Sequence, residues 1–247
     1  MSSVPHPLST SLPAPAPAPA VSRLPAARAE AVEPLFRGPV EVNWQHLIER
    51  RPISLQINPE LPSYLSLPEV HQLLNVARTP KDHLLVRLLW QTGARISEVI
   101  SITVGQLTLT DEWSSGVLLD RLKQRGRQKK LQRDVIRKRW VPITDMSLVR
   151  ELRRYINGAE LKPGDRLLPH TRQWGYKRIS LLSEKAKLPI SVHPHMLRHS
   201  FACNAVLHGE PLTVIRDWLG HASLEQTEIY TRVLATETNH LMRYMSF

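Results

Sequence analysis

The most informative stretch of this 247-residue chain is GHASLEQTEIYTR, residues 220–232. Tyr230 follows the Gly220-His221 pair within it, and an upstream cluster, His195-Met196-Leu197-Arg198, precedes both. Groups that bind phosphate therefore come before a tyrosine, in order along the chain. A tyrosine in this setting is a candidate nucleophile for a phosphodiester, because nearby cations would help a phenol to attack. The stretch indicates DNA-breaking chemistry at Tyr230.

Two arginines provide the cations that such chemistry needs. Arg95 lies in Thr92-Gly-Ala-Arg-Ile-Ser-Glu98, and Arg198 closes the upstream cluster. Attack on phosphorus raises the charge on its non-bridging oxygens, and a guanidinium offers a planar fork of donors that stays protonated. His195 lies three residues before Arg198, so on a helix both side chains share one face. His221 is a further candidate donor to the phosphate.

The leaving sugar hydroxyl needs a proton, and a lysine is the expected general acid. A lysine near other cations has its pKa lowered toward the working range. Lys123 lies near the start of a strongly basic segment, residues 121–139. This segment holds ten Lys or Arg and one acid, Asp134. Lys129 and Lys130 are less favoured candidates nearer the middle of this segment.

The basic segment is flanked by two β-type runs, Val117-Leu118-Leu119 and Trp140-Val141-Pro142-Ile143. This pattern predicts a small antiparallel sheet with a basic β-hairpin. Its cations are suited to bind the DNA backbone, although a merely solvated hairpin is the alternative. The residues assigned to DNA binding are Arg121, Arg125, Arg127, Lys129 and Lys130.

Helix signals dominate the chain from Tyr64 onward. Ser66-Leu-Pro-Glu69 is a capping box, and Thr79-Pro-Lys-Asp82 begins a second helix whose leucine stripe stops at Gly93. The predicted fold class is therefore α+β and mostly helical. Further helices are expected to start near Ser147, Thr171, Pro194, Pro211, Ser223 and Ala235.

Three parts are expected along the chain. Residues 1–33 are rich in Ser, Pro and Ala, a composition typical of an extended, mobile tail. Residues 34–62 permit a short helix or a docking arm. Residues 63–247 form the main domain, ending in a helix over about 235–247 that is suited to dock on a neighbouring subunit.

Composition limits the partners and the compartment. The formal net charge of +11 implies an anionic partner, such as nucleic acid, although a ribosomal or membrane-surface protein would share it. The single cysteine, Cys203, excludes an internal disulfide and a cysteine-based zinc site, and fits a reducing cytosolic or nuclear compartment, of which the cytoplasm is expected. No run reaches the roughly 20 apolar residues that span a bilayer, so no membrane partner is expected.

The other histidines and the tryptophans have simpler interpretations. His193, His195 and His199 resemble a metal cluster, but no nearby carboxylate completes a site, so no metal is expected. His199 and His83 are interpreted as structural or surface histidines. Four tryptophans are interpreted as core or rim aromatics: Trp113, Trp140, Trp174 and Trp218.

In combination, five motifs resemble the catalytic domain of the tyrosine recombinase (phage integrase) family: residues 64–74, 92–98, 193–202, 219–221 and 229–232. They follow the family's order and spacing over roughly residues 64–235. The resemblance implies that Tyr230 forms a 3′-phosphotyrosine, that Lys123 protonates the 5′ oxygen and that Glu98 braces the site. It implies a scissile phosphate held by Arg95, His195, Arg198 and His221. It also implies that rejoining needs no ATP, metal or other cofactor.

Two features depart from the family pattern. The family's helical DNA-clamping domain has no full counterpart, since only residues 1–62 precede the main domain. The clamp is then reduced to residues 34–62, or this is a member with a catalytic domain only. The basic hairpin is also longer than the family's usual turn.

The expected function is site-specific recombination of double-stranded DNA by a homotetramer on two sites. Its setting would be resolution, inversion or integration on a mobile element such as a plasmid. Two alternatives stay open. One is a type IB topoisomerase, which relaxes supercoils as a monomer, and the other is a DNA-binding regulator that keeps the fold but does not cut.

Overall fold

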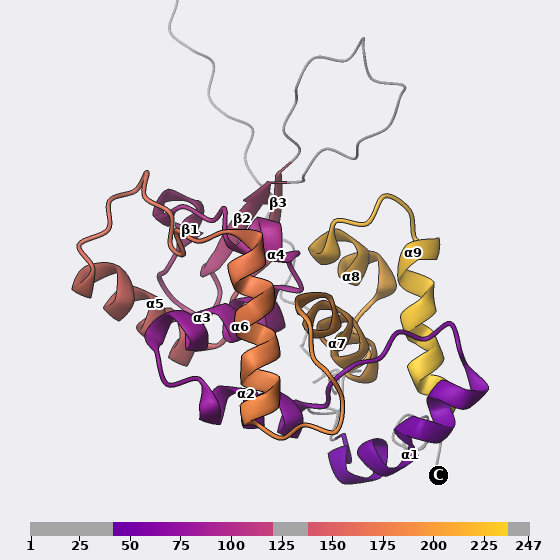
Figure 1. Cartoon of the computed structure of the whole chain (residues 1–247). Coiled ribbons are helices and arrows are strands. Elements are labelled where there is room, and N and C mark those ends of the chain that lie inside the picture. The colour runs from indigo at the N-terminus through magenta and orange to yellow at the C-terminus, as the bar shows by residue number, and fades with distance from the viewer. Residues whose placement is uncertain (1–41, 121–137, 237–247) are drawn as a thin grey trace, which may run out of the picture. The chain divides into compact units, whose positions relative to one another are not determined.

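Helices make up most of the structure, a computed structural model that describes residues 42–120 and 138–236 (Figure 1). The helices are α1 (Trp44–Ile57), α2 (Leu67–Val76), α3 (Pro80–Thr92), α4 (Ile96–Val99), α5 (Met146–Gly158), α6 (Arg172–Lys185), α7 (Pro194–Leu207), α8 (Leu212–Leu219) and α9 (Glu225–Glu228). Two 3₁₀ segments, η1 (Val104–Gln106) and η2 (Ile229–Thr236), and three strands, β1 (Leu107–Thr108), β2 (Gly116–Asp120) and β3 (Lys138–Pro142), complete the set. The mostly helical α+β fold is confirmed.

The helix boundaries follow from local side-chain chemistry. Ser66 and Glu69 form the predicted capping box before α2, and Thr79 accepts a hydrogen bond from the backbone N–H of Asp82 at the start of α3. Gly93 ends α3 in the left-handed region, with φ of 57°. Glycine adopts this conformation without the steric penalty of a β-carbon. These ends were predictable because each depends on residues within one helical turn.

The three strands form an antiparallel sheet in the order β1-β2-β3. Val117 pairs with Val141 and Leu119 with Arg139, as expected for the two β-type runs. The sheet prediction is thus confirmed for the paired strands. The basic segment between them, over residues 121–137, lies outside the described residues, and so do Lys123 and the five assigned DNA-binding cations.

Helix α7 lies at the centre of the hydrophobic core. Ten of its 14 residues are buried. Met196 and Leu197 pack with α2, α3, α5, α6 and the sheet, whereas the second half of α7 packs with α1, α8 and η2. Figure 1 shows α7 between α6 and α8, in agreement with the contacts between these helices. A helix that is buried on most sides makes a rigid base for the polar groups that it carries.

The segment before the main domain contributes a helix. Within α1, Leu47 is buried, and Arg51 makes a bidentate ion pair with Glu69 of α2 at 2.6 and 2.8 Å. Arg51 also donates to the carbonyl of Tyr64 at 3.0 Å. Helix α1 contacts η2, and Figure 1 shows the two side by side. Residues 44–57 therefore cover one side of the η2 segment.

The tryptophans divide between core rim and surface. Trp174 and Trp218 are half-buried against the core, as predicted. The prediction was wrong for Trp113, which is 88% exposed in the turn before β2. The backbone N–H of Ser114 donates to the side chain of Asp111, so Trp113 lies in a tight turn at the surface and not in a strand or helix that packs on the core. Among the described residues, no helix is both long and apolar enough to cross a bilayer.

Candidate active site

Arg198 is the most deeply buried of the candidate cations, with 3% of its surface exposed. Its Nη1 donates to the carbonyl of Gly93 at 2.6 Å, and its Nη2 donates to the carbonyl of Leu219 at 2.7 Å. The guanidinium therefore joins α7 to the ends of α3 and α8. Burial, with repulsion from Arg95, lowers the pKa of Arg198 to about 10, which still leaves it charged at neutral pH.

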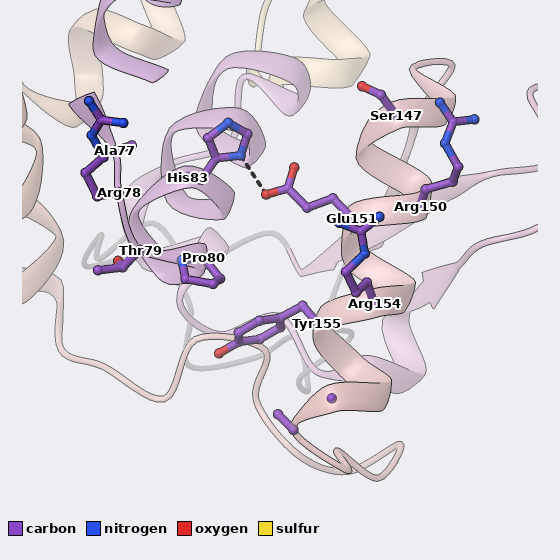
Figure 2. A pocket seen from close by; sticks show the side chains of 12 residues that line it. Ala77, Arg78, Thr79, Pro80, His83, Ser147, Arg150, Glu151, Arg154 and Tyr155 are labelled. Carbon is purple, nitrogen blue, oxygen red and sulfur yellow. Dashed lines mark hydrogen bonds and ion pairs between the residues drawn. The ribbon is translucent and has the colours of Figure 1, made fainter. Parts of the chain in front are cut away.

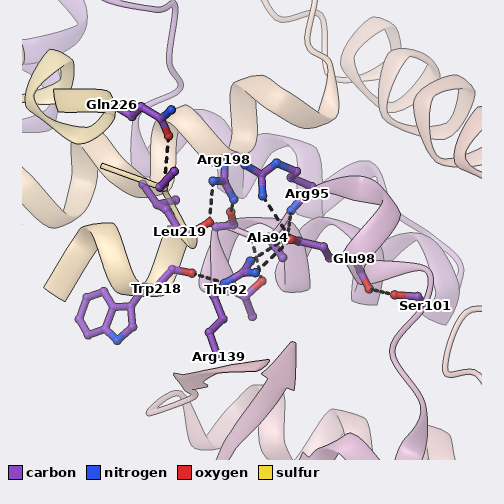
Figure 3. Close-up of polar contacts among 12 residues, drawn as sticks. Thr92, Ala94, Arg95, Glu98, Ser101, Arg139, Arg198, Trp218, Leu219 and Gln226 are labelled. Carbon is purple, nitrogen blue, oxygen red and sulfur yellow. Dashed lines mark hydrogen bonds and ion pairs between the residues drawn. The ribbon is translucent and has the colours of Figure 1, made fainter. Parts of the chain in front are cut away.

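A buried carboxylate, Glu98, braces Arg95 from below (Figure 3). Glu98 accepts from the backbone N–H of Arg95 at 2.7 Å, and its Oε1 lies 3.3 Å from Nη1 of Arg95. Arg139 of β3 approaches the same carboxylate at 2.7 and 3.0 Å. Burial opposes ionisation of Glu98, but the hydrogen bonds from Arg139 hold its pKa below the usual range.

Arg139 was missed in the sequence. Besides Glu98, it binds the carbonyl of Trp218 through Nε at 2.8 Å, so the strand β3 is fixed to α4 and α8 together. Its burial was predictable, because Arg139 lies two residues before Val141 in β3 and the two side chains must share one face of the sheet. A charged residue at an inward position calls for a buried partner of opposite charge.

Two histidines flank the arginines. His195 stands in the first turn of α7, and partial burial together with Arg198 lowers its pKa. His221 follows Gly220, which ends α8 with φ of 67°. Its Nδ1 lies 2.9 Å from Oγ1 of Thr227, and burial beside Arg198 lowers its pKa to about 3. The imidazole of His221 is therefore neutral at working pH, and that of His195 is harder to protonate than a free histidine.

Tyr230 lies in η2 with 3% of its surface exposed. Its hydroxyl lies 2.9 Å from Nδ1 of His199, and its ring lies nearly parallel to that of His221, with centroids 6.3 Å apart. Burial raises the pKa of Tyr230 to about 12, although Arg198 partly opposes this. The interpretation of His199 as a structural or surface histidine was thus incomplete, because this histidine touches the candidate nucleophile.

The structure brings most of the predicted residues together. Arg95 and Glu98 come from the start of α4, His195 and Arg198 from α7, His221 from the end of α8, and Tyr230 from η2. The charges of Arg95 and Arg198 both act on His221 and on Tyr230, as expected for a single cluster. Lys123 is the predicted member that lies outside the described residues. The strand that follows its segment, β3, is nevertheless tied to the cluster through Arg139.

A separate pocket of about 760 Å³ lies between the start of α3 and helix α5 (Figure 2). Nδ1 of His83 lies 2.6 Å from Glu151 on its wall, and Arg78, Arg150 and Arg154 also line it. None of its lining residues belongs to the cluster around Arg198. This pocket is therefore distinct from the candidate site. Within the described part of the chain, no group of His, Cys, Asp or Glu side chains is arranged to hold a metal ion.

Comparisons with known proteins agree with this cluster. The model of the phage integrase family matches residues 63–237. A resolvase of Escherichia coli is 32% identical over 225 residues, which cover 81% of this chain and 84% of the resolvase. The tyrosine recombinase XerC of Bacillus subtilis (strain 168) is 31% identical over 212 residues, 76% of this chain and 64% of XerC.

Solved structures show the same fold. The XerA recombinase has a TM-score of 0.61 at 23% identity, over 76% of this chain and 66% of XerA. The XerH recombinase, in a pre-cleavage complex with its difH substrate, has a TM-score of 0.56 at 25% identity, over 69% of this chain and 50% of XerH. The chain thus spans only part of these longer recombinases.

Proposed function

Because the chain belongs to the phage integrase family and is a tyrosine recombinase, an enzyme that cuts and rejoins DNA at specific sites, we propose that Tyr230 is its nucleophile. The observation that carries this assignment is the position of Tyr230 beside Arg198 and His221 in a site built from four separate elements. Five tyrosines occur in the chain, and this one joins a cluster of phosphate-binding groups.

The proposed reaction is a phosphoryl transfer in two steps. The Tyr230 oxygen attacks the scissile phosphorus, a bond from phosphorus to this oxygen forms, and the bond from phosphorus to the 5′ oxygen breaks. The phenol loses its proton and the departing 5′ oxygen gains one. A free 5′ hydroxyl from the partner strand then attacks the 3′-phosphotyrosine and restores the phosphodiester. The number of phosphodiester bonds is conserved, so the energy of the broken bond is kept in the covalent link.

The surrounding residues would stabilise the charge that develops on the phosphate. Arg95 is the more open arginine, with 34% of its side chain exposed, and is suited to contact a non-bridging oxygen. Arg198 would contribute positive charge from the buried side of the site. His195 and His221 would donate hydrogen bonds to the phosphate. Such fixed donors act strongly because they need no reorganisation during the reaction. Glu98 would hold Arg95 in place without touching DNA.

Lys123 is proposed as the general acid that protonates the 5′ oxygen. A substrate whose bridging 5′ oxygen is replaced by sulfur tests this role, because a thiolate leaves without protonation. Lys123→Ala should lose cleavage of the ordinary substrate but recover most of it with the sulfur substrate. Lys129→Ala, at a position assigned to DNA binding, is the matched control and should change the cleavage of both substrates by the same factor. Equal losses on both substrates would assign Lys123 to binding instead.

We infer that the biological task is resolution of DNA on a mobile element such as a plasmid. The support is the similarity to a resolvase of E. coli over most of the length of both chains. The partner would be a double-stranded recombination site, bound by a homotetramer in the cytoplasm. Residues 237–247, outside the described part of the chain, are proposed to dock on a neighbouring subunit.

The relatives do not favour the two alternative functions. They are named as resolvases and recombinases, whereas a type IB topoisomerase would relax supercoils as a monomer. A regulator that does not cut would need no nucleophile, yet Tyr230 and its neighbouring cations are all present.

Trapping of the covalent intermediate tests the proposed function. DNA attached to the protein in cells would be recovered and sequenced to map the site, which is then made as a duplex with a nick beside the scissile phosphate. The parent should form a covalent adduct on a denaturing gel, and Tyr230→Phe should form none while binding the duplex equally well. An adduct that persists in Tyr230→Phe would move the nucleophile elsewhere. Supercoil relaxation without joining of two sites would point to the topoisomerase.

A further inference from the structure

The hydroxyl of the proposed nucleophile is already engaged by a protein group. Oη of Tyr230 lies 2.9 Å from Nδ1 of His199, and the two rings are tilted by 41° with centroids 5.9 Å apart. His199 comes from α7, directly after Arg198, and is half-buried. Its ring is therefore fixed by the central helix of the fold, while Tyr230 belongs to the short segment η2 that packs across this helix.

The protonation states give this hydrogen bond its direction. Burial, with neighbouring His195 and Arg198, lowers the pKa of His199 to about 4, whereas burial raises the pKa of Tyr230 to about 12. At neutral pH the imidazole is neutral and the phenol is protonated. We assign the Nε2–H tautomer to His199 because a phenol is a better donor than acceptor, so the phenol O–H donates and Nδ1 accepts. Because the pKa of Tyr230 lies far above that of His199, transfer of the phenol proton to His199 is unfavourable in this arrangement. His199 is thus an acceptor and not the base that ionises Tyr230.

The position of Tyr230 also keeps its hydroxyl from a phosphate. Only 3% of the residue is exposed and its hydroxyl already contacts His199, so little of the side chain faces a DNA phosphate in this arrangement. The backbone there is 3₁₀ over eight residues, Ile229–Thr236. Such runs rarely exceed three or four residues because their hydrogen-bond geometry is poorer. The hydroxyl of the nucleophile is therefore held by a polar contact to α7, while the segment that carries it packs on the same helix through Val233 and other apolar side chains.

We propose that His199 is a positioning residue that holds Tyr230 in a resting arrangement and releases its hydroxyl before attack on DNA. This inference rests on the proposed role of Tyr230 as nucleophile. The hydrogen bond exists in the resting enzyme and is absent once the oxygen bonds to phosphorus. An interaction of this kind stabilises the ground state but not the transition state, and it therefore slows the cleavage step.

Substitution of His199 by residues with and without an acceptor tests the proposal. His199→Phe keeps a ring of similar size but cannot accept the hydrogen bond, whereas His199→Gln retains an amide oxygen and is the matched control. Single-turnover cleavage of the nicked duplex is measured with enzyme in excess, and DNA affinity is measured separately. His199→Phe should cleave about fivefold faster than the parent, which corresponds to the typical net value of one neutral hydrogen bond. His199→Gln should stay near the parent rate, and the Kd for DNA should not change in either variant.

Other outcomes would overturn the proposal. A slower cleavage step in His199→Phe, with an unchanged melting temperature, would mean that His199 assists the chemistry. An unchanged rate would mean that the hydrogen bond does not restrain Tyr230. If His199→Phe does not fold, His199→Leu takes its place in the same comparison.

A measurement without DNA separates this inference from the proposed function. The unfolding free energies of the parent, His199→Phe, Tyr230→Phe and the double variant form a double-mutant cycle. The two positions should be coupled, and additive losses would overturn the hydrogen bond on which the inference depends. If the parent formed no covalent adduct at all, the proposed function would fail, while this cycle would still report on the contact between His199 and Tyr230.

Discussion

Arg95 and Arg198 carry the same charge but are held very differently. Arg198 is buried and gives two hydrogen bonds to backbone carbonyls, of Gly93 and Leu219. Arg95 is half-exposed and has one long ion pair, with Glu98 at 3.3 Å. Arg198 is thus tied into the fold by its hydrogen bonds, whereas Arg95 keeps a partly exposed guanidinium.

This contrast predicts different losses in the two alanine variants. Both Arg95→Ala and Arg198→Ala should reduce cleavage by about 10²- to 10³-fold, because the first removes a donor to the developing charge and the second removes a positive charge close to it. Arg198→Ala should also lower the unfolding free energy by about 1–3 kcal/mol, since two buried carbonyls lose their donor. Arg95→Ala should cost about 1 kcal/mol or less. Cleavage assays and urea denaturation on the same preparations check both statements.

DNA affinity is the control for this pair. Most of it should remain in each variant, because many phosphate contacts lie elsewhere. If affinity and cleavage fell by the same factor, the arginines would act in binding and not in the chemical step.

The buried histidines predict how stability depends on pH. The pKa values of His199 and His221 are about 4 and about 3 in the folded protein, against about 6.5 in an unfolded chain. As the pH falls below about 6.5, the unfolded state binds protons that the folded state does not, so the unfolding free energy falls. The loss continues until the pH reaches the folded values.

His221→Asn should make this dependence shallower. Between about pH 6 and pH 5 the slope of the unfolding free energy against pH should decrease by up to about one proton. Most carboxylates stay ionised in this window, because their usual pKa values lie near 4. Urea denaturation at pH 7, 6 and 5 measures the slope. Identical slopes in parent and variant would contradict the lowered pKa of His221.

At the scale of elements, a buried ion pair connects the sheet to the candidate site. Arg139 of β3 and Glu98 at α4 are 5% and 1% exposed, and they share two hydrogen bonds. Arg139 also reaches the end of α8 through Trp218. The strand that leads out of the basic segment is thereby fixed relative to Arg95, so this pair sets how sheet and helices meet.

Breaking this pair should cost much more than removing a surface arginine. Arg139→Met leaves the Glu98 carboxylate buried with only Arg95 beside it, and should lower the unfolding free energy by about 3–5 kcal/mol. Arg150→Met, at an exposed position of α5, should change it by about 0.5 kcal/mol or less. Denaturant unfolding gives both values. A loss below about 1 kcal/mol in Arg139→Met would show that solvent or another group replaces the pair.

At the scale of the whole molecule, the net charge of +11 favours binding to DNA. Ten of the 33 Lys and Arg residues fall within residues 121–139. Counterion release makes the affinity fall with salt, by a slope of about 0.9 for each phosphate contact. The proposed role of this segment in backbone binding can therefore be measured without knowledge of the DNA sequence.

Removal of three cations from this segment should flatten the salt dependence. The variant with glutamine at Arg125, Arg127 and Lys129 should lower the slope of log Kd against log salt by about 2 to 3 on random duplex DNA. A matched variant with glutamine at Arg78, Arg150 and Arg154, which line the separate pocket, has the same loss of charge. Equal flattening in both variants would assign the effect to total charge instead of local contacts.

Local signals explain what was predictable. The ends of α2 and α3 depend on Ser66, Thr79 and Gly93, whose side chains or backbone act within one turn. The pairing of β2 with β3 follows from two apolar runs on either side of a basic segment. The candidate site residues were predictable from the order of the arginines, histidines and tyrosine along the chain. Few side-chain types can bind a phosphate or attack its phosphorus, so these residues stand out in the sequence.

The sequence alone thus determined the fold class, the family and the membership of Tyr230, Arg95 and Arg198 in one candidate site. Only the tertiary structure decided the contacts that hold this site, between Arg139 and Glu98, between Arg198 and Gly93, and between His199 and Tyr230. These partners are 41, 105 and 31 residues apart in the chain. Caps and periodic patterns extend over a few residues, whereas contacts at such separations depend on how the helices pack. The contact of His199 with Tyr230 therefore depends on how η2 packs against α7.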